Sequence, residues 1–375
     1  MNVGFEAKRL FTNNTGLGNY NRFVVEALSN YFPGTNYFVY TPRLDIHPDA
    51  KRIIDRPNVR IITPPASYQF LRSTSIWRTW GISKEPVTKS LQVFHGLSQE
   101  LPLGLPKGLL KIVTVHDLIF FRYPQFYNPV DVAIYKSKLK HACRKADKIV
   151  AISRQTGEDL MNFLSVDESR IEIIYQGCHP NFKVRHSNEA INQIKTKYRL
   201  PQEYILNVGT VEKRKNVMLL IKALALIPKQ SRIPLVVMGK QTEYYRLVIA
   251  KAESLDVRDD IHFIQGVSFE DFPKIYQGAS LFVYPSLFEG FGIPLIEAIE
   301  SGVPVITSSG SCFREAAGPA SIFVDPGDDR ELAFQITSVL GSQEARTRMI
   351  TASRAYAMQF NPDVIAGKLD ALYKG

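Results

Sequence analysis

The sequence of 375 residues predicts two doubly wound α/β domains in series. Short apolar runs rich in Val, Ile, Leu and Phe alternate with longer segments of helical pattern, which is typical of βαβ units. The apolar runs are continuous rather than alternating, as expected when helices cover both faces of a parallel sheet. This alternation weakens across the polar stretch 183–202 and then restarts, so we expect the domain boundary there.

The first half supplies the elements of an N-terminal domain, which we expect at residues 1–184. Apolar runs predict strands at 2–7, 93–96, 111–117 and 148–153. Helical patterns follow at 17–32, around 134–149 and at 154–164. Each helix comes after a strand, so this half forms a parallel sheet.

The second half repeats the arrangement, and we expect a C-terminal domain at residues 185–357. Strands are predicted at 204–210, 234–240, 260–266, 280–286 and 304–309. Helices are predicted between them at 216–227, 244–255, 269–279 and 294–302. A last helix with apolar positions near 3.6-residue spacing is expected within 358–375.

Composition limits the classes of protein. The N-terminus lacks the apolar core of a secretory signal, and no run reaches the length needed to cross a bilayer, so we expect a cytosolic protein. Three widely separated cysteines predict reduced thiols. Residues 1–184 hold 24 Lys/Arg against 15 Asp/Glu, whereas residues 185–375 hold 22 against 21. The basic first half indicates an anionic partner, which composition leaves open among membrane headgroups, nucleic acid and an anionic substrate.

The segment FEGFGIPLIE, residues 288–297, follows the strand 280–286 and leads into a helix that we expect to begin at Pro294. Ile293 cannot cap this helix with its side chain, so the amides of Leu295 and Ile296 are expected to lack a local partner. Gly290 and Gly292 would let an anion approach the backbone. Because ligands of open α/β sheets bind at the carboxyl ends of strands, the segment predicts a phosphate site.

Two glutamates flank this segment. Glu297, one turn into the helix, is placed to accept hydrogen bonds from a neutral polyol such as ribose, and Glu289 would face what lies beyond the phosphate. Together they predict a site for a sugar nucleotide. The alternative is that Glu289 lies in a solvated turn and that Glu297 shares a polar helix face with Glu300 and Ser301.

GTVEKRKN, residues 209–216, follows the strand 204–210 and precedes an apolar helix for which Asn216 is a plausible N-cap. Lys213, Arg214 and Lys215 form a cluster of cations at the carboxyl end of this strand, and two cations there would neutralise a diphosphate and stabilise it as a leaving group. A solvated cluster of charges is the alternative.

Weaker signals lie in the first half. TGLGNYNRF, residues 15–23, resembles a dinucleotide loop but has Asn21 where the third glycine is required, which disfavours a dehydrogenase. His95 and the pair His116 and Asp117 stand at strand ends. The helix around 134–149 places Lys136, Lys140, Arg144 and Lys148 on one stripe, which predicts either a solvated face or attraction to anionic lipid, with the aromatic SIWRTWG segment (75–81) as a second membrane contact or as core.

The pattern Glu289, Gly290, Phe291, Gly292, Pro294 and Glu297 resembles the E-x7-E signature of the family 4 retaining glycosyltransferases, which have the GT-B fold. The resemblance spans nearly the whole chain. It implies two Rossmann-like domains facing a cleft, a C-terminal domain that binds the nucleotide sugar, and a last helix that returns to the N-terminal domain.

The resemblance also implies roles for residues. Catalytic roles are expected of Glu289, His116, Lys215 and Arg214. Donor binding is expected of Gly16, Gly18, Gly209, Thr210, Arg214, Lys215, Phe291, Gly292, Ile293 and Glu297. The acceptor side is expected to involve Asn19, His95 and Asp117. Thr210 departs from relatives that have an arginine there, and the Gly-Thr pair resembles some mannosyltransferases, so this position leaves the donor open. The similarity of segments 14–23 and 95–102 to transferases of bacterial surface polysaccharides makes GDP-mannose the preferred donor, with a UDP-sugar as the second choice.

The expected reaction moves a hexose from the nucleotide sugar to a hydroxyl of a glycan or lipid-linked oligosaccharide. The segments at 14–23 and 95–102 are most similar to transferases of bacterial surface polysaccharides. No Asp-x-Asp motif occurs in the sequence, so we expect no metal and no cofactor. We expect a cytoplasmic enzyme, peripheral at the inner face of the membrane, without nucleic acid as a partner. A GT-B sugar-nucleotide epimerase and a nucleic-acid binder stay as alternatives.

Overall fold

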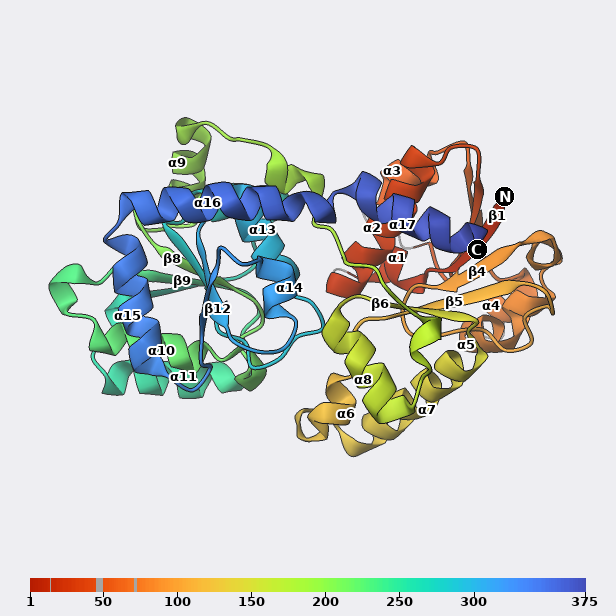
Figure 1. Ribbon diagram of the computed structural model, residues 1–375, viewed down its shortest axis with the longest axis horizontal. Helices are drawn as coiled ribbons and strands as arrows, with labels where there is room; N and C mark the ends of the chain where they lie inside the picture. The colour runs from red at the N-terminus through yellow and green to blue at the C-terminus, as the bar shows by residue number, and fades with distance from the viewer. Residues whose placement is uncertain (14, 45–49, 71–72) are drawn as a thin grey trace. The chain divides into compact units, whose positions relative to one another are not determined.

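The computed structural model describes residues 1–13, 15–44, 50–70 and 73–375. These residues divide into two compact units: unit 1 comprises Met1–Gly177 with Phe360–Gly375, and unit 2 comprises Cys178–Gln359. Each unit is a parallel sheet between layers of helices (Figure 1), so the predicted fold class of two Rossmann-like domains is confirmed. The chain passes between the units at 177/178 and 359/360, where the sequence indicated 184/185 and 357/358.

Unit 1 contains a parallel sheet whose strand order, over the described residues, is β3-β2-β1-β4-β5-β6-β7. Its strands are β1 (Asn2–Glu6), β2 (Asn36–Tyr40), β3 (Val59–Ile62), β4 (Val93–Gly96), β5 (Leu110–Val115), β6 (Lys148–Ala151) and β7 (Ile171–Ile173). The strand order changes direction between β1 and β4. Such a switch point is where open α/β sheets bind ligands.

Helices cover both faces of this sheet. They are α1 (Lys8–Thr12), α2 (Gly16–Tyr31), α3 (Lys51–Ile54), α4 (Ala66–Phe70), α5 (Thr74–Ile76), α6 (Ile119–Arg122), α7 (Pro129–Lys145), α8 (Arg154–Leu164) and α17 (Pro362–Lys374). One core lies between the sheet and the α7 side and includes Trp77 and Leu139. On the other face α2 packs against α1, α3 and α17.

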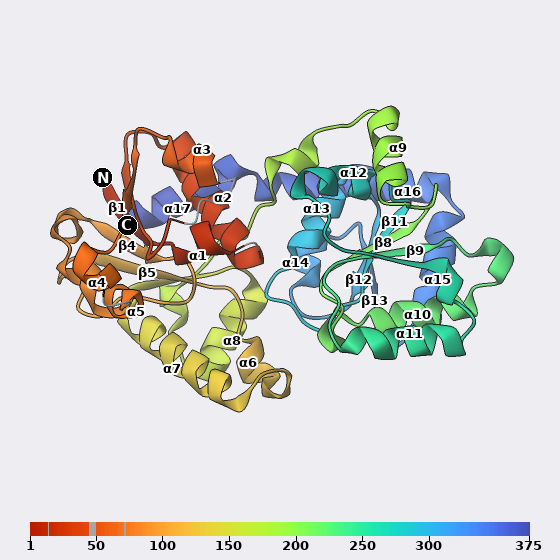
Figure 2. The same ribbon diagram turned by 180° about the vertical axis from the view of Figure 1, so that it is seen from behind.

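The C-terminal helix α17 belongs to unit 1. Ile365, Ala366, Leu369 and Tyr373 are its buried apolar residues, at the helical spacing that the sequence indicated. α17 packs against α2, and the two helices lie side by side in Figures 1 and 2. The expectation that the last helix returns to the N-terminal domain is therefore confirmed.

Unit 2 contains a second parallel sheet, with the order β10-β9-β8-β11-β12-β13 in the described part of the chain. Its strands are β8 (Ile205–Val208), β9 (Leu235–Met238), β10 (Ile261–Ile264), β11 (Leu281–Tyr284), β12 (Val305–Ser308) and β13 (Ile322–Val324). The order changes direction between β8 and β11. The loops that follow β8 and β11 contain GTVEKRKN and FEGFGIPLIE.

The helices of unit 2 form two layers (Figure 2). One layer, α10 (Val217–Leu226), α11 (Tyr244–Ser254) and α15 (Asp329–Leu340), contributes to an apolar core with the strands. The other contains α9 (Asn188–Lys197), α12 (Phe272–Gln277), α13 (Ile293–Ser301), α14 (Phe313–Ala317) and α16 (Gln343–Ala357). α13 thus packs between neighbouring helices while its N-terminus lies at the carboxyl edge of the sheet.

One local expectation, the length of the basic stripe, needs correction. α7 ends at Lys145, and Lys148 lies in β6, so the basic stripe is shorter than the sequence indicated. Trp77 is completely buried and donates from Nε1 to Glu85 at 2.7 Å, whereas Trp80 is 53% exposed. The three cysteines are free and buried. Among the described helices we find none that is both long enough and apolar enough to span a membrane.

Candidate functional site

The loop between β11 and α13 makes a glycine turn into the helix. Gly292 has φ +110°, a left-handed conformation that side chains rarely adopt, and none of the side chains that the structure describes caps α13. The helix begins at Ile293, one residue earlier than expected. The Leu295 amide donates to the Gly292 carbonyl at 3.0 Å, so the expectation that Leu295 lacks a local partner is wrong. The turn at Gly292 directs its own carbonyl back to the helix start.

Glu289 is buried and holds two cations. Its Oε2 pairs with Nη1 of Arg214 at 2.8 Å, and its Oε1 accepts from Nζ of Lys215 at 2.6 Å and from the hydroxyl of Tyr284 at 3.1 Å. Burial favours the neutral acid, but the charges of Lys215 and Arg214 outweigh this effect and lower the pKa of Glu289 to about 2. A solvated turn, the alternative for Glu289, is therefore excluded.

The two cations come from a short 3₁₀ helix, Lys213–Lys215, after β8. Arg214 Nη1 also donates to the Phe288 carbonyl at 2.9 Å, and the Leu287 amide donates to the Arg214 carbonyl at 2.8 Å. Lys215 Nζ donates to the Tyr284 hydroxyl at 2.7 Å. Burial opposes the charge of Lys215, but Glu289 outweighs it and raises the pKa of Lys215 to about 12. Two positive charges are thus fixed beside the FEGFG loop.

Glycines after β8 and β9 let these loops approach each other. Gly209 has φ +146°, and a Cβ on it would lie 3.5 Å from the Lys215 side chain. A Cβ on Gly239 would lie 2.0 Å from the Gly209 carbonyl oxygen. Gly209 and Thr210 are both partly exposed next to the Lys215 side of the loop.

Asn216 does not act as the predicted N-cap. It stands at the start of α10 in a left-handed conformation, and its side chain makes no capping hydrogen bond. Instead Nδ2 donates to the carbonyls of Pro285 at 3.1 Å and Pro326 at 2.9 Å. Asn216 therefore ties together three loops at the carboxyl edge of the sheet.

The pKa of Glu297 is shifted in the opposite direction from that of Glu289. It is buried in α13, and its Oε2 accepts a hydrogen bond of 2.7 Å from the hydroxyl of Tyr276. No cation pairs with Glu297 among the described residues, and burial raises its pKa to about 7 despite the hydrogen bond from Tyr276. The solvated helix face, the alternative for Glu297, is excluded as well. A buried carboxylate with one hydrogen bond suits a hydroxyl-bearing ligand.

Two residues that sequence reasoning missed hold the FEGFG loop. The Ser311 hydroxyl donates to the Glu289 carbonyl at 3.1 Å and accepts from the Glu289 amide at 3.4 Å. The Cys312 thiol donates to the carbonyls of Glu289 at 3.2 Å and Phe291 at 2.9 Å. Both follow β12, and a polar Ser-Gly-Ser-Cys turn at a strand end was the available signal. Phe291 is buried here and Ile293 is partly exposed.

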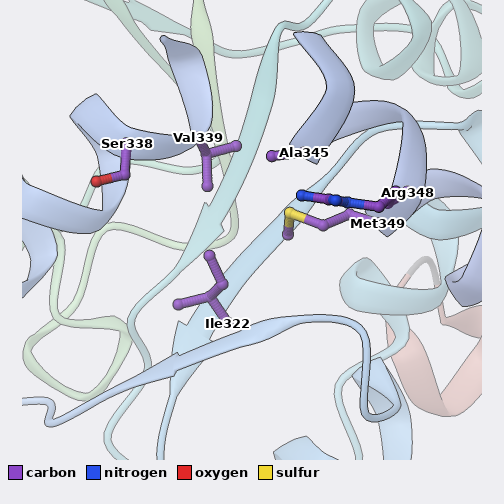
Figure 3. A pocket seen from close by; sticks show the side chains of 6 residues that line it. All are labelled: Ile322, Ser338, Val339, Ala345, Arg348 and Met349. Atoms are coloured by element: carbon purple, nitrogen blue, oxygen red, sulfur yellow. The ribbon is translucent and has the colours of Figure 1, made fainter. Parts of the chain in front are cut away.

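A separate pocket of about 260 Å³ lies between β13, α15 and α16. Figure 3 shows the side chains that line it: Ile322, Ser338, Val339, Ala345, Arg348 and Met349. Ile322 is the first residue of β13, so the pocket lies at the amino-terminal edge of the parallel sheet. The loops after β8 and β11 lie at the opposite edge.

In unit 1 the glycine loop forms the start of α2. The Asn13 side chain accepts from the amides of Thr15 at 2.8 Å and Gly18 at 3.2 Å, and so takes the role of a cap. A Cβ on Gly18 would lie 1.9 Å from the Asn13 carbonyl oxygen, whereas Gly16 is exposed and a Cβ on it would have no atom of the described residues within 4 Å. Asn19 is exposed and accepts from Arg22 at 2.6 Å.

His116 is buried, and its Nε2–H donates to the Leu97 carbonyl at 2.8 Å. Burial lowers its pKa to about 4, so the ring is neutral at pH 7. The neighbouring Asp117 accepts from the Ile119 amide at 3.1 Å. This hydrogen bond helps to begin α6.

His95 does not fit the acceptor-facing role that the resemblance implied. Its ring is completely buried and shares hydrogen bonds of 2.7 Å with both Tyr373 and Thr114. Burial lowers its pKa to about 3. His95 therefore joins β4 and β5 to α17 inside unit 1.

Comparison with known sequences matches both halves of the chain. Residues 15–182 match the model of Glycosyltransferase Family 4, and residues 189–356 match that of Glycosyl transferases group 1. The O-antigen chain mannosyltransferase B of Escherichia coli is 30% identical over 273 residues, which is 72% of this chain and 70% of that protein. The serotype-specific mannosyltransferase WbdA of Escherichia coli is 31% identical over 252 residues, 64% of this chain but 31% of that much longer protein.

Solved structures show the same fold. Anabaena Alr3699/HepE, crystallised with UDP and glucose, aligns with 100% of this chain and 99% of its own at a TM-score of 0.73, with 16% sequence identity. The two family models together with the mannosyltransferase relative, which covers most of both sequences, show that the chain belongs to the family 4 glycosyltransferases.

Proposed function

We propose that this glycosyltransferase is a retaining, metal-independent hexosyltransferase that moves a mannosyl group from GDP-mannose to a hydroxyl of a glycan or lipid-linked oligosaccharide. The product would be part of a bacterial surface polysaccharide. Two relatives named as mannosyltransferases, one of them of the O-antigen chain, support the choice of sugar and pathway. A UDP-sugar is the second choice of donor.

The observation that carries the proposal is the pair of cations held by Glu289 at the switch point between β8 and β11. Arg214 and Lys215 are fixed by carbonyl and hydroxyl partners, so they need little rearrangement to meet a charge that develops on a leaving group. A diphosphate placed there would share the cations with Glu289 and would be stabilised as it departs. The amide groups near Gly292 lie at the same edge of the sheet.

Glu297 supplies the second part of the donor site. Tyr276 occupies its Oε2, so Oε1 is the oxygen that would accept from the ribose hydroxyls. A hydroxyl group brings its own proton and needs no counter-charge, which suits a carboxylate that has no cationic neighbour among the described residues.

In the proposed reaction the bond between the anomeric carbon and the diphosphate oxygen breaks, and the oxygen keeps the electron pair. The acceptor hydroxyl attacks from the same face, and its proton passes to a phosphate oxygen. Arg214 and Lys215 neutralise the diphosphate, which is the charge that a metal ion would otherwise balance. Positioning of the transferred sugar by Glu289 and His116 stays a prediction.

We also propose that the enzyme works in the cytoplasm at the inner face of the membrane. The exposed side of α7 carries Val130, Ile134 and Tyr135, of which Val130 is 67% exposed, and Lys140 and Arg144 are exposed on the same helix. Apolar side chains beside cations suit a surface of anionic lipid, to which each basic residue adds about 1 kcal/mol. Flotation with phosphatidylglycerol vesicles, and its loss with phosphatidylcholine alone, tests this location.

A panel of nucleotide sugars tests the function. Thermal stabilisation by GDP-mannose and slow hydrolysis of GDP-mannose, with both responses lost in Lys215→Ala and in Glu297→Ala, would support the donor site.

Transfer to a lipid-linked oligosaccharide is then followed by NMR of the anomeric proton, with and without chelator. An α-linked product formed in chelator supports retention without metal. No response to any nucleotide sugar would overturn the proposal, and a donor converted to an isomer without an acceptor would indicate an epimerase.

A further inference from the structure

The carboxyl edge of the unit 1 sheet has a switch point of its own, between β1 and β4, which lie next to each other in Figure 1. Glu6 is the last residue of β1 and stands in register with Tyr40 on one side and Gly96 on the other. It is 2% exposed, although a carboxylate is seldom buried without complete pairing. The position that a ligand would occupy in this kind of sheet therefore begins with a buried acid.

Glu6 belongs to a chain of charges. Arg78 donates from Nε to Glu6 Oε1 at 2.8 Å and from Nη2 to Glu100 Oε2 at 2.6 Å, and Lys138 donates to Glu100 Oε1 at 3.0 Å. Burial favours the neutral acid of Glu100, but Arg78 and Lys138 outweigh it and keep its pKa below the usual value. Arg78 thus stands where a bound cation would otherwise be needed between the two acids.

The backbone around this cluster is unusual. Arg78 lies on a π-helical turn, Trp77–Gly81, a rare conformation that is found frequently at functional sites. Trp77 fixes this turn in the core, and Gln99, just before Glu100, has φ +64°. The fold therefore holds Arg78 and Glu100 at defined places beside Glu6.

The cluster is nevertheless incomplete. Oε2 of Glu6 is buried and has no hydrogen-bond partner among the described residues. Lys8, two residues beyond Glu6, forms no ion pair in the described part of the chain and lies close enough for Glu6 and Glu100 to affect its pKa. A buried acceptor without a donor is unfavourable, so a ligand that brings a hydroxyl group would complete the cluster.

We propose that Glu6, Arg78 and Glu100 form a binding site for a sugar ring of the acceptor, in which Glu6 Oε2 accepts a hydrogen bond from a ring hydroxyl. The inference rests on the proposed function and names the residues of this chain that would bind the acceptor. A neutral polyol fits because a hydroxyl group brings its own proton to Glu6 Oε2, whereas an ionised phosphate or carboxylate has no proton to donate to this oxygen. Arg78 is a positioning residue, since it fixes both carboxylates.

A purely structural ion pair is the competing explanation, and it predicts a different result. If Glu6 only anchors the π-helical turn, its removal lowers thermal stability without a selective effect on acceptor. If it binds a hydroxyl, Glu6→Gln keeps the shape but loses the charged acceptor, so the KM for the acceptor rises while the KM for the donor is unchanged. Glu172→Gln is a control for the loss of a paired carboxylate elsewhere in the same sheet, because Glu172 on β7 is partly exposed and also pairs with a cation, Lys148, at 3.2 Å.

The experiment measures binding of methyl α-glycosides of mannose, glucose, galactose, rhamnose and N-acetylglucosamine by saturation-transfer NMR. The native chain, Glu6→Gln, Glu100→Gln and Glu172→Gln are compared, with donor hydrolysis recorded for each. Loss of a charged hydrogen bond predicts about tenfold weaker glycoside binding by Glu6→Gln. Glu100→Gln should also weaken glycoside binding, because Arg78 loses the partner that fixes it beside Glu6. Glu172→Gln should bind the glycosides as the native chain does. Glu100 is partly exposed, so Glu100→Gln is expected to fold. If Glu6→Gln does not fold, glycoside binding by Glu100→Gln tests the proposal instead.

Equal glycoside binding by Glu6→Gln and native chain, or no binding of any glycoside by the native chain, overturns the inference while donor hydrolysis still supports the proposed function. Absence of donor hydrolysis from the native chain overturns the proposed function and, with it, an acceptor role for this cluster. Selective loss of glycoside binding with donor hydrolysis retained supports both.

Discussion

The buried acid Glu297 is expected to make unit 2 less stable as the pH rises. Its pKa is about 7 in the folded chain and 4.5 as an isolated side chain. The folded state therefore holds the proton more tightly than the unfolded state, so the contribution to stability is complete below pH 4.5 and is lost as the pH rises through 7. At about 1.4 kcal/mol per pKa unit, the loss is about 3 kcal/mol.

Glu297→Gln should remove this dependence. The amide has nearly the shape of the acid and can accept from Tyr276, but it does not ionise. Between pH 5 and pH 8 the native chain should lose about 2.5 kcal/mol of unfolding free energy relative to the variant, because part of the contribution is already lost at pH 5. Any constant cost of the amide cancels, because only the change with pH is compared.

Hydrogen–deuterium exchange of peptides from α13 and β11 measures this difference, because intrinsic exchange rates cancel between native chain and variant at equal pH. Trp77 and Trp80, the two tryptophans of the chain, both lie in unit 1, so tryptophan fluorescence serves as an internal control that should not change. Parallel exchange curves for both proteins from pH 5 to pH 8 would refute the reasoning and place the pKa of Glu297 near its ordinary value.

Three further changes test the same site. Glu289→Gln should strengthen binding of GDP at least tenfold while transfer falls, because Arg214 and Lys215 lose the carboxylate that competes with the diphosphate; weaker binding of GDP in calorimetry would contradict this. Tyr276→Phe should raise the KM for the donor about tenfold, with kcat little changed, as a hydrogen bond to a charged group is lost. Gly292→Ala should destabilise the chain by about 1–2 kcal/mol in thermal unfolding, because its φ of +110° disfavours a Cβ; an unchanged melting temperature would exclude strain there.

The sequence was sufficient for the fold because most strands are continuous apolar runs. β8, β9, β11 and β12 were each placed within two residues of their observed ends. The strands that escaped notice are β2, β3, β7 and β13. β7 reads Ile-Glu-Ile and β13 spans three residues, so neither carries a periodic signal long enough to separate it from a loop.

The site was predictable in part, and the limit has a physical cause. Sequence placed Arg214, Lys215, Glu289 and Glu297 at the carboxyl ends of strands, since parallel strands bring such loops to one edge. It gave no means to pair Lys215 with Glu289, 74 residues away, or to find the thiol of Cys312 on the Phe291 carbonyl. These contacts depend on side-chain directions in loops, which have no periodic pattern to read.

The two glutamates of the FEGFGIPLIE segment make opposite contributions to the free energy of unfolding. Glu289 has a pKa of about 2, so its contribution to stability is present above pH 4.5 and is lost as the pH falls through 2. That contribution is about 3 kcal/mol at pH 8, similar to the cost of ionised Glu297 at the same pH. One carboxylate thus offsets the other within a single loop and helix. The stabilising ion pairs of Glu289 with Arg214 and Lys215 therefore compensate for Glu297, a destabilising acid that the chain keeps for its ligand. The diphosphate would share the same two cations with Glu289. We therefore expect Lys215→Ala to harm folding as well as donor binding, whereas Glu297→Gln should harm donor binding alone.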